Sequence, residues 1–92
     1  MLFRSQEEQD DGRLRVRVGA AVGEPVERNN DLFGSTVQLA ARLCSHASPG
    51  EVLVSAALAE LCLGKGMRFD DLGEVNLKGF ADAVRVRRVR LD

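Results

Sequence analysis

Residues 31–42 read DLFGSTVQLAAR, and this stretch decides how the chain on either side of it folds. Asp31 ends a polar loop, Gly34 permits a tight backbone turn, and Ser35 is placed to cap the start of a helix. Beyond the cap, apolar residues recur at helical spacing and define one face: Val37, Ala40, Ala41 and Cys44. The stretch therefore predicts a glycine turn followed by an amphipathic helix.

Two long polar side chains of this helix, Gln38 and Arg42, lie one turn apart and away from the apolar face. Beside a turn that carries the carboxylate of Asp31, they could grip an anionic ligand that also offers hydrogen-bonding groups. On spacing alone, a solvated helix face explains the same pattern and is the simpler interpretation.

Before the helix, residues 14–20 alternate apolar and basic side chains, which predicts a strand with one buried face. Gly19 and Gly23 leave room for a ligand or a neighbouring backbone, or else they mark bulges, and both interpretations stay open. Residues 1–12 begin apolar and become acidic, so we predict the end of a helix and then a mobile loop.

After the helix, a turn at Pro49-Gly50 leads to a short buried strand at 52–54, and Ser55 caps a helix over 56–63. Residues 67–72 and 75–77 are predicted to form a hairpin around a turn at Gly73-Glu74.

The last strand, residues 84–91, changes the parity of its apolar side chains, and a bulge at Arg87-Arg88 would restore them to one face. Its four arginines are then interpreted as the solvated face of an edge strand, not as a nucleic-acid site.

Composition excludes several classes of function. The 92 residues have a formal net charge of -1, which argues against a general nucleic-acid or membrane-surface binder. We expect neither a membrane-spanning segment nor a signal peptide, since no apolar run has the required length or flanks. Cys44 and Cys62 are interpreted as reduced cysteines of a cytoplasmic protein, with a disulfide left open but unsupported. Asp70, Asp71 and Glu74 are interpreted as a charged turn and not as metal ligands.

Four motifs, in this order, resemble the catalytic domain of the class III nucleotidyl cyclases. Residues 31–42 are similar to the signature D-x-aromatic-G-x-x-V-N-x-A-x-R, with Gln38 in place of asparagine. The other three are RVGAAVG at 17–23, ASPGEVLVS at 47–55 and LGEVNLKG at 72–79. The resemblance runs from about Arg15 to the C-terminus and covers the second half of that domain.

The resemblance implies an α+β fold, in which an antiparallel or mixed sheet has helices packed on one side, as part of a ferredoxin-like cyclase homology domain. Residues 13–92 would be the C-terminal half of this domain, and residues 1–12 a mobile N-terminal segment.

The resemblance also implies a chemistry. Class III cyclases convert a nucleoside triphosphate to a 3′,5′-cyclic monophosphate and pyrophosphate, with two metal ions held by two aspartates. Arg42 corresponds to the arginine that stabilises the transition state, and Gln38 stands where an asparagine orients the ribose. Lys78 corresponds to the phosphate-binding lysine and Asp31 to the residue that reads the base, and Gly34 completes the nucleotide-binding set.

The family's metal aspartates belong to the first half of the domain and have no counterpart in this sequence. We therefore expect no cofactor in this chain alone, and Mg²⁺ or Mn²⁺ only if another segment completes the site. Two hypotheses account for this: half of a cyclase site that a partner completes, or a degenerate cyclase-homology module for binding, regulation or dimerisation. As partner we expect a second copy or another cyclase-like chain, recruited by an open edge of the strand near 14–22, with weak binding of an ATP-type nucleotide.

Overall fold

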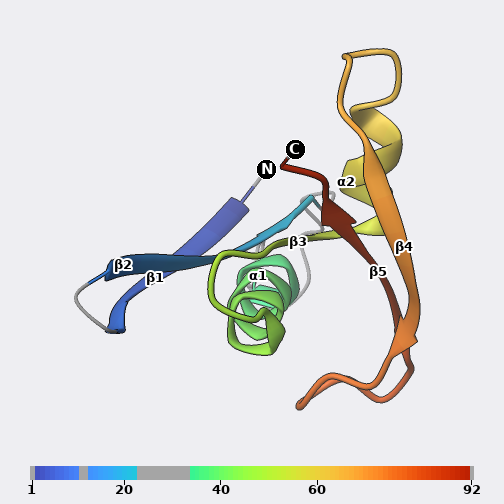
Figure 1. Cartoon of the computed structure of the whole chain (residues 1–92). Coiled ribbons are helices and arrows are strands. Elements are labelled where there is room, and N and C mark those ends of the chain that lie inside the picture. The colour runs from blue at the N-terminus through green and yellow to red at the C-terminus, as the bar shows by residue number, and fades with distance from the viewer. Residues whose placement is uncertain (1, 11–12, 23–33, 92) are drawn as a thin grey trace.

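The structure, a computed structural model, describes residues 2–10, 13–22 and 34–91 (Figure 1). Its elements are β1 (Leu2–Asp10), β2 (Arg13–Ala21), α1 (Gly34–His46), β3 (Val52–Ser55), α2 (Ala56–Leu61), β4 (Phe69–Val75) and β5 (Val84–Val89). The strands form one sheet in the order β1-β2-β3-β5-β4. The β2–β3 pair is parallel and the other neighbouring pairs are antiparallel. This mixed sheet with two helices confirms the predicted α+β class.

The two helices cover opposite faces of the sheet. Consecutive strand residues point to opposite sides, and neighbours such as Leu53 and Val54 belong to different clusters. The cluster under α1 contains Ala21, Ala40, Leu43, Ala47, Leu53, Leu77 and Val86. The cluster under α2 contains Ala20, Val54, Leu58 and Ala59. In Figure 1 the helices accordingly stand on either side of β3. The prediction that helices pack on one side is therefore wrong: α2 follows β3 without a linker, and the chain turns directly onto the second face.

The contact between α1 and β2 depends on Gly19. A Cβ at this position would clash with the backbone of the helix, at Cys44 N and Ala40 O, and would lie 2.8 Å from the carbonyl carbon of Leu43. The Cys44 thiol also donates a hydrogen bond to the Arg17 carbonyl oxygen, with a sulfur–oxygen distance of 3.6 Å. Of the alternatives left open, Gly19 thus makes room for a neighbouring backbone, whereas Gly23 lies outside the described residues.

The N-terminal segment is a strand. β1 pairs with β2 along its whole length, from Leu2 opposite Ala21 to Asp10 opposite Arg13. The prediction of a helix end and a loop is therefore wrong for residues 2–10, because an edge strand can be polar where its side chains face water. β2 has β1 on one side and β3 on the other, so the open edge predicted near 14–22 is also wrong.

The two C-terminal strands differ from the predicted hairpin. β4 runs without a reversal from Phe69 to Val75, and a register shift between Asp71 and Glu74 takes the place of the predicted turn. Gly73 within the shift has a φ of 77°, a conformation that glycine adopts readily.

β5 contains no bulge in the described pairing, since its residues oppose β3 and β4 in continuous register from Arg87 to Val89. Val86 enters the cluster under α1 and Val89 packs against the cluster under α2. The parity change therefore reflects burial on two faces. β5 also lies between β3 and β4, so its prediction as an edge strand is wrong.

Local predictions around α2 are confirmed. The strand at 52–54 is β3, and the Leu58 backbone N–H donates to Ser55 Oγ at 3.3 Å, as an N-cap requires. The helix ends at Leu61, two residues before the predicted end.

The close contact at Gly19 gives a stability prediction. We expect Gly19→Ala to lower the free energy of unfolding by about 2–3 kcal/mol, because the new methyl group forces α1 away from β2. The measurement is urea denaturation followed by circular dichroism. Gly66→Ala is the matched control, since Gly66 has a φ of 77° and open space around it, and should cost about 1 kcal/mol through backbone strain alone. Equal losses in the two variants would contradict the close-packing explanation.

Candidate functional site

A shallow pocket of about 260 Å³ lies between the second half of α1 and the connection from β4 to β5. It is lined by Arg42, Ser45, His46, Asn76, Leu77 and Lys78. The pocket brings together Arg42 and Lys78, two predicted site residues that are far apart in the sequence.

A four-residue turn presents Lys78. The Phe80 backbone N–H donates to the Leu77 carbonyl oxygen at 3.1 Å, and Gly79 has a φ of 90°. A positive φ at the third residue of such a turn favours glycine. Leu77 is buried in the cluster under α1, and Phe80 packs against that cluster. Both ends of the turn are therefore anchored in the core, and Lys78 stands between them.

Arg42 is held by the helix itself. Its neighbour Leu43 is fully buried, which fixes how α1 is rotated about its axis. The Nε atom of Arg42 is buried and has no hydrogen-bond partner among the described residues. Because this atom is buried, an anion in the pocket would be bound by the outer nitrogens of the guanidinium, which is permanently charged.

The remaining predicted site residues do not line the pocket. Gln38 is exposed, and a Cβ on Gly79 would clash with its Nε2 atom, so its amide lies over the Lys78 turn. Gly34 is the first residue of α1, so the helix starts before the predicted cap Ser35, and Asp31 lies outside the described residues.

Four residues of the pocket were not predicted as site residues: Ser45, His46, Asn76 and Leu77. Ser45 and His46 follow Arg42 by about one helical turn, and this spacing could have identified both. His46 lies in the last turn of α1. Asn76 carries no local signal, because its place in the pocket depends on the position of the turn that follows it.

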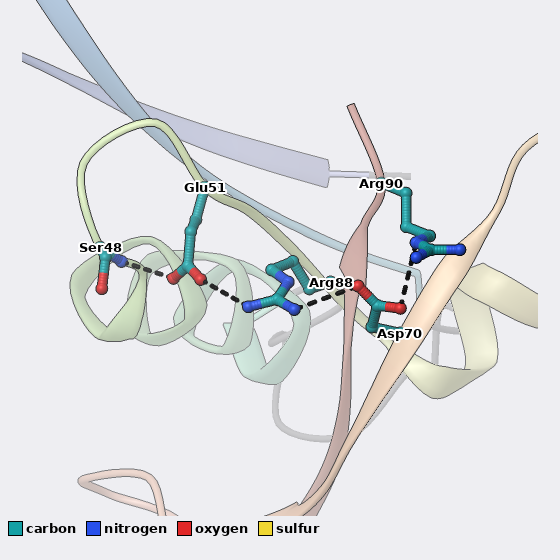
Figure 2. A network of polar contacts seen from close by, with 5 residues as sticks. All are labelled: Ser48, Glu51, Asp70, Arg88 and Arg90. Carbon is teal, nitrogen blue, oxygen red and sulfur yellow. Dashed lines mark hydrogen bonds and ion pairs between the residues drawn. The ribbon is translucent and has the colours of Figure 1, made fainter. Parts of the chain in front are cut away.

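Acidic residues near β5 are held by arginines (Figure 2). Arg88 donates to Glu51 at 3.2 Å and to Asp70 at 3.1 Å, and Arg90 pairs with Asp70 at 3.3 Å. The Ser48 backbone N–H also donates to Glu51, at 2.8 Å. This chain of contacts ties β3, β5 and β4 together on one face of the sheet.

Asp71 is compensated in the same way. It accepts hydrogen bonds from the Gly73 backbone N–H at 3.0 Å and from Arg85 at 2.7 Å. The pKa of Asp71 is lowered, chiefly by the Gly73 N–H and further by Arg85. In the part of the chain that the structure describes, no group of three or more His, Cys, Asp or Glu residues could hold a metal ion. These acids therefore do not fit the two metal ions of a cyclase, and we assign them no step in its chemistry.

The fold and the pocket define the chain as an α+β domain with two cationic side chains, Arg42 and Lys78, at one shallow pocket. A model of the adenylate and guanylate cyclase catalytic domain family matches residues 1–88. The chain therefore belongs to this family. Neither helix in the described part of the chain is long and apolar enough to cross a membrane.

Relatives and solved structures agree with this assignment. The chain is 38% identical over 85 residues to a pH-sensitive adenylate cyclase of Mycobacterium tuberculosis, a match that covers 88% of this chain and 21% of that protein. It is 47% identical over 51 residues to an adenylate cyclase of Streptomyces coelicolor, over 55% of this chain and 13% of that one.

Among solved structures, an adenylate/guanylate cyclase/hydrolase from Silicibacter pomeroyi superposes with a TM-score of 0.69 at 31% identity, over 87% of this chain and 48% of that chain. The adenylyl cyclase CyaB of P. aeruginosa also gives a TM-score of 0.69, at 26% identity, over 87% of this chain and 44% of that one. The chain thus spans about a fifth or less of these curated relatives and just under half of these solved chains.

The contacts of Glu51 give a pH prediction. Its pKa is lowered from the ordinary 4.5, chiefly by the Ser48 N–H and further by Arg88. A lowered pKa stabilises the fold above the unfolded value, and this contribution disappears as the pH falls through the folded value. We expect Glu51→Gln to lower the free energy of unfolding at pH 7 by no more than about 1 kcal/mol, because the pair is partly exposed.

The difference between wild type and Glu51→Gln should shrink as the pH falls through the folded pKa of Glu51, and it should vanish below that pKa. Urea denaturation at a series of pH values tests this, with Glu60→Gln on the exposed side of α2 as the control. A Glu51→Gln effect that grows on acidification would refute the assigned contacts.

Proposed function

We propose that this chain supplies the phosphate-binding half of a class III cyclase active site. The complete site would convert a nucleoside triphosphate, with ATP the first candidate, to its 3′,5′-cyclic monophosphate and pyrophosphate. The observation that carries the proposal is the pocket shared by Arg42 and Lys78. Family membership and adenylate cyclase relatives support the choice of chemistry.

Each cation has a distinct task in this proposal. In the reaction the ribose 3′-oxygen bonds to the α-phosphorus while the bond to the β-phosphate oxygen breaks, so negative charge builds on the phosphate oxygens. The guanidinium of Arg42 is permanently charged and offers a planar fork of donors, which suits charge that develops on the α-phosphate. The ammonium of Lys78 is a compact charge at the tip of a turn, which suits the outer phosphates.

The metal-binding aspartates would come from another segment of the polypeptide or from a partner chain. A second copy or another cyclase-like chain would bring that surface against the open side of the pocket. β2 is covered by β1 in this structure, so the pocket face is the place where we propose association. Cys44 and Cys62 are free cysteines, which supports placing the protein in the cytoplasm.

A second candidate is a cyclase-homology module that binds a nucleotide or a partner without turnover. One observation favours it: Gln38, which stands at the ribose-orienting position, lies over Gly79 and does not line the pocket. Activity measurements separate the two candidates.

The first activity prediction concerns Arg42. Combined with a cyclase segment that carries the two aspartates, and supplied with ATP and Mn²⁺, the chain should form cyclic AMP, whereas the chain alone should form none. Arg42→Ala should lower kcat by about 10²–10³-fold, because it removes a donor to the developing charge. The product is measured by chromatography.

Arg85→Ala is the charge-matched control, since Arg85 lies on β5, pairs with Asp71 of β4 and does not line the pocket. Full activity in Arg42→Ala would exclude the proposed role. A wild type that binds ATP but stays inactive with the aspartate-bearing segment would favour the second candidate.

The second prediction concerns affinity for the isolated chain. Two cations without metal ions or a closing partner surface should bind ATP with a Kd on the order of a millimolar. The affinity should fall as salt is added, because the contacts are electrostatic and exposed. Isothermal titration at low salt with ATP, AMP and the variant Lys78→Ala tests this, with Lys65→Ala as the charge-matched control. Micromolar ATP binding at physiological salt, or equal affinity for AMP and ATP, would be incompatible with this site.

A further inference from the structure

Helix α1 touches the Lys78 turn at three successive places. Leu77 is buried in the cluster that includes α1 residues, Gln38 lies over Gly79, and Arg42 shares a pocket with Lys78. The first contact is apolar, the second is packing by a neutral amide, and the third places two like charges near each other. The Lys78 turn is therefore packed against α1 and is not a free loop.

The contact at Gly79 needs both a glycine and a long side chain. A Cβ at Gly79 would clash with Gln38 Nε2 and would lie 3.5 Å from Gln38 Cδ. The terminal amide thus occupies the space beside the Gly79 Cα that any other residue would fill. An asparagine at position 38 is shorter by one carbon–carbon bond, so its amide would end short of Gly79.

Charge explains why such a contact is useful. Arg42 and Lys78 line the pocket, and no Asp or Glu lines it among residues 2–10, 13–22 and 34–91, so the two charges repel each other before an anion arrives. Lys78 is exposed at the tip of its turn, and repulsion would favour turn conformations that carry it away from Arg42. A neutral side chain can hold the turn without cancelling the positive charge of the pocket.

We propose that Gln38 is a positioning residue: it packs on Gly79 and holds the Lys78 turn against α1, so that Lys78 stays beside Arg42. Gln38 then acts on the ligand through Lys78 and has no contact with the ribose. The consequence for phosphate binding rests on the proposed function, whereas the hold on the turn does not.

The hold on the turn is tested without any ligand. Hydrogen exchange of the Phe80 amide reports the turn, because this N–H donates to Leu77. In Gln38→Asn the exchange rate should rise about fivefold, because the shortened amide releases the turn. In Gln38→Met, which keeps the length and loses the amide, the rate should stay within about twofold of wild type. The Ala47 N–H, which donates to the Leu43 carbonyl oxygen at the end of α1, is the internal reference, and its exchange rate should not change.

The effect on binding is tested with inorganic tripolyphosphate, which has no ribose. Gln38→Asn should weaken tripolyphosphate several-fold, and Gln38→Met should not. In a Lys78→Ala background the Gln38→Asn effect should disappear, whereas in an Arg42→Ala background it should persist, because Gln38 acts through Lys78.

The outcomes are distinguishable. Unchanged Phe80 exchange in Gln38→Asn overturns the inference, whether or not the wild type binds tripolyphosphate. Equal loss of ATP binding in Gln38→Met and Gln38→Asn, with tripolyphosphate unaffected in both, also overturns it and assigns the amide to the ribose. Faster exchange in Gln38→Asn alone, with a wild type that does not bind tripolyphosphate, supports the hold on the turn and counts against the proposed function.

Discussion

The direct contact of the α1 backbone with β2 at Gly19 fixes where the helix and the pocket lie on the sheet. Because no side chain separates them there, α1 lies low enough for Ala40 and Leu43 to join a cluster with Leu53 and Val86 from two other strands. The same cluster accepts Leu77, the first residue of the lysine turn. The position of the pocket therefore depends on close packing at one glycine, against the turn of α1 that carries Arg42.

Charges are balanced differently along β5 and at the pocket of Arg42 and Lys78. Along β5 the acids are satisfied: Asp70 and Glu51 share Arg88, and Asp71 pairs with Arg85. At the pocket, two cationic side chains gather, and in the described part of the chain no acid lines it. Compensated charges brace strands, whereas uncompensated ones attract an anion. This contrast, and not the number of charged residues, separates the structural ion pairs from the candidate site.

Membership of the cyclase family gives this contrast a meaning. In the function proposed above, groups approach a triphosphate from opposite sides, and this chain would offer the side that carries positive charge. Its matches span about a fifth or less of the curated relatives and just under half of the solved chains. The proposed activity therefore belongs to an assembly in which another surface faces Arg42 and Lys78. In the role proposed for it, Gln38 stands at a family position over Gly79 and holds the turn beside the ligand instead of contacting the ligand itself.

The sequence by itself determined the local elements and the chemical character of the site. Helical periodicity predicted α1, the Ser55 cap predicted the start of α2, and the motif order placed Arg42 and Lys78 as candidate cations. The predictions of the two helices succeed because capping and periodicity depend on residues a few positions apart.

Only the tertiary structure decided how the strands meet and which faces are covered. The acidic segment that pairs as β1 has no apolar pattern of its own, and the parity change from Val86 to Val89 fits a bulge as well as burial on two faces. The same holds for the amide of Gln38, whose neighbour Gly79 is distant in sequence. Strand pairing and side-chain contact of this kind are set by partners far along the chain, and no local pattern contains them.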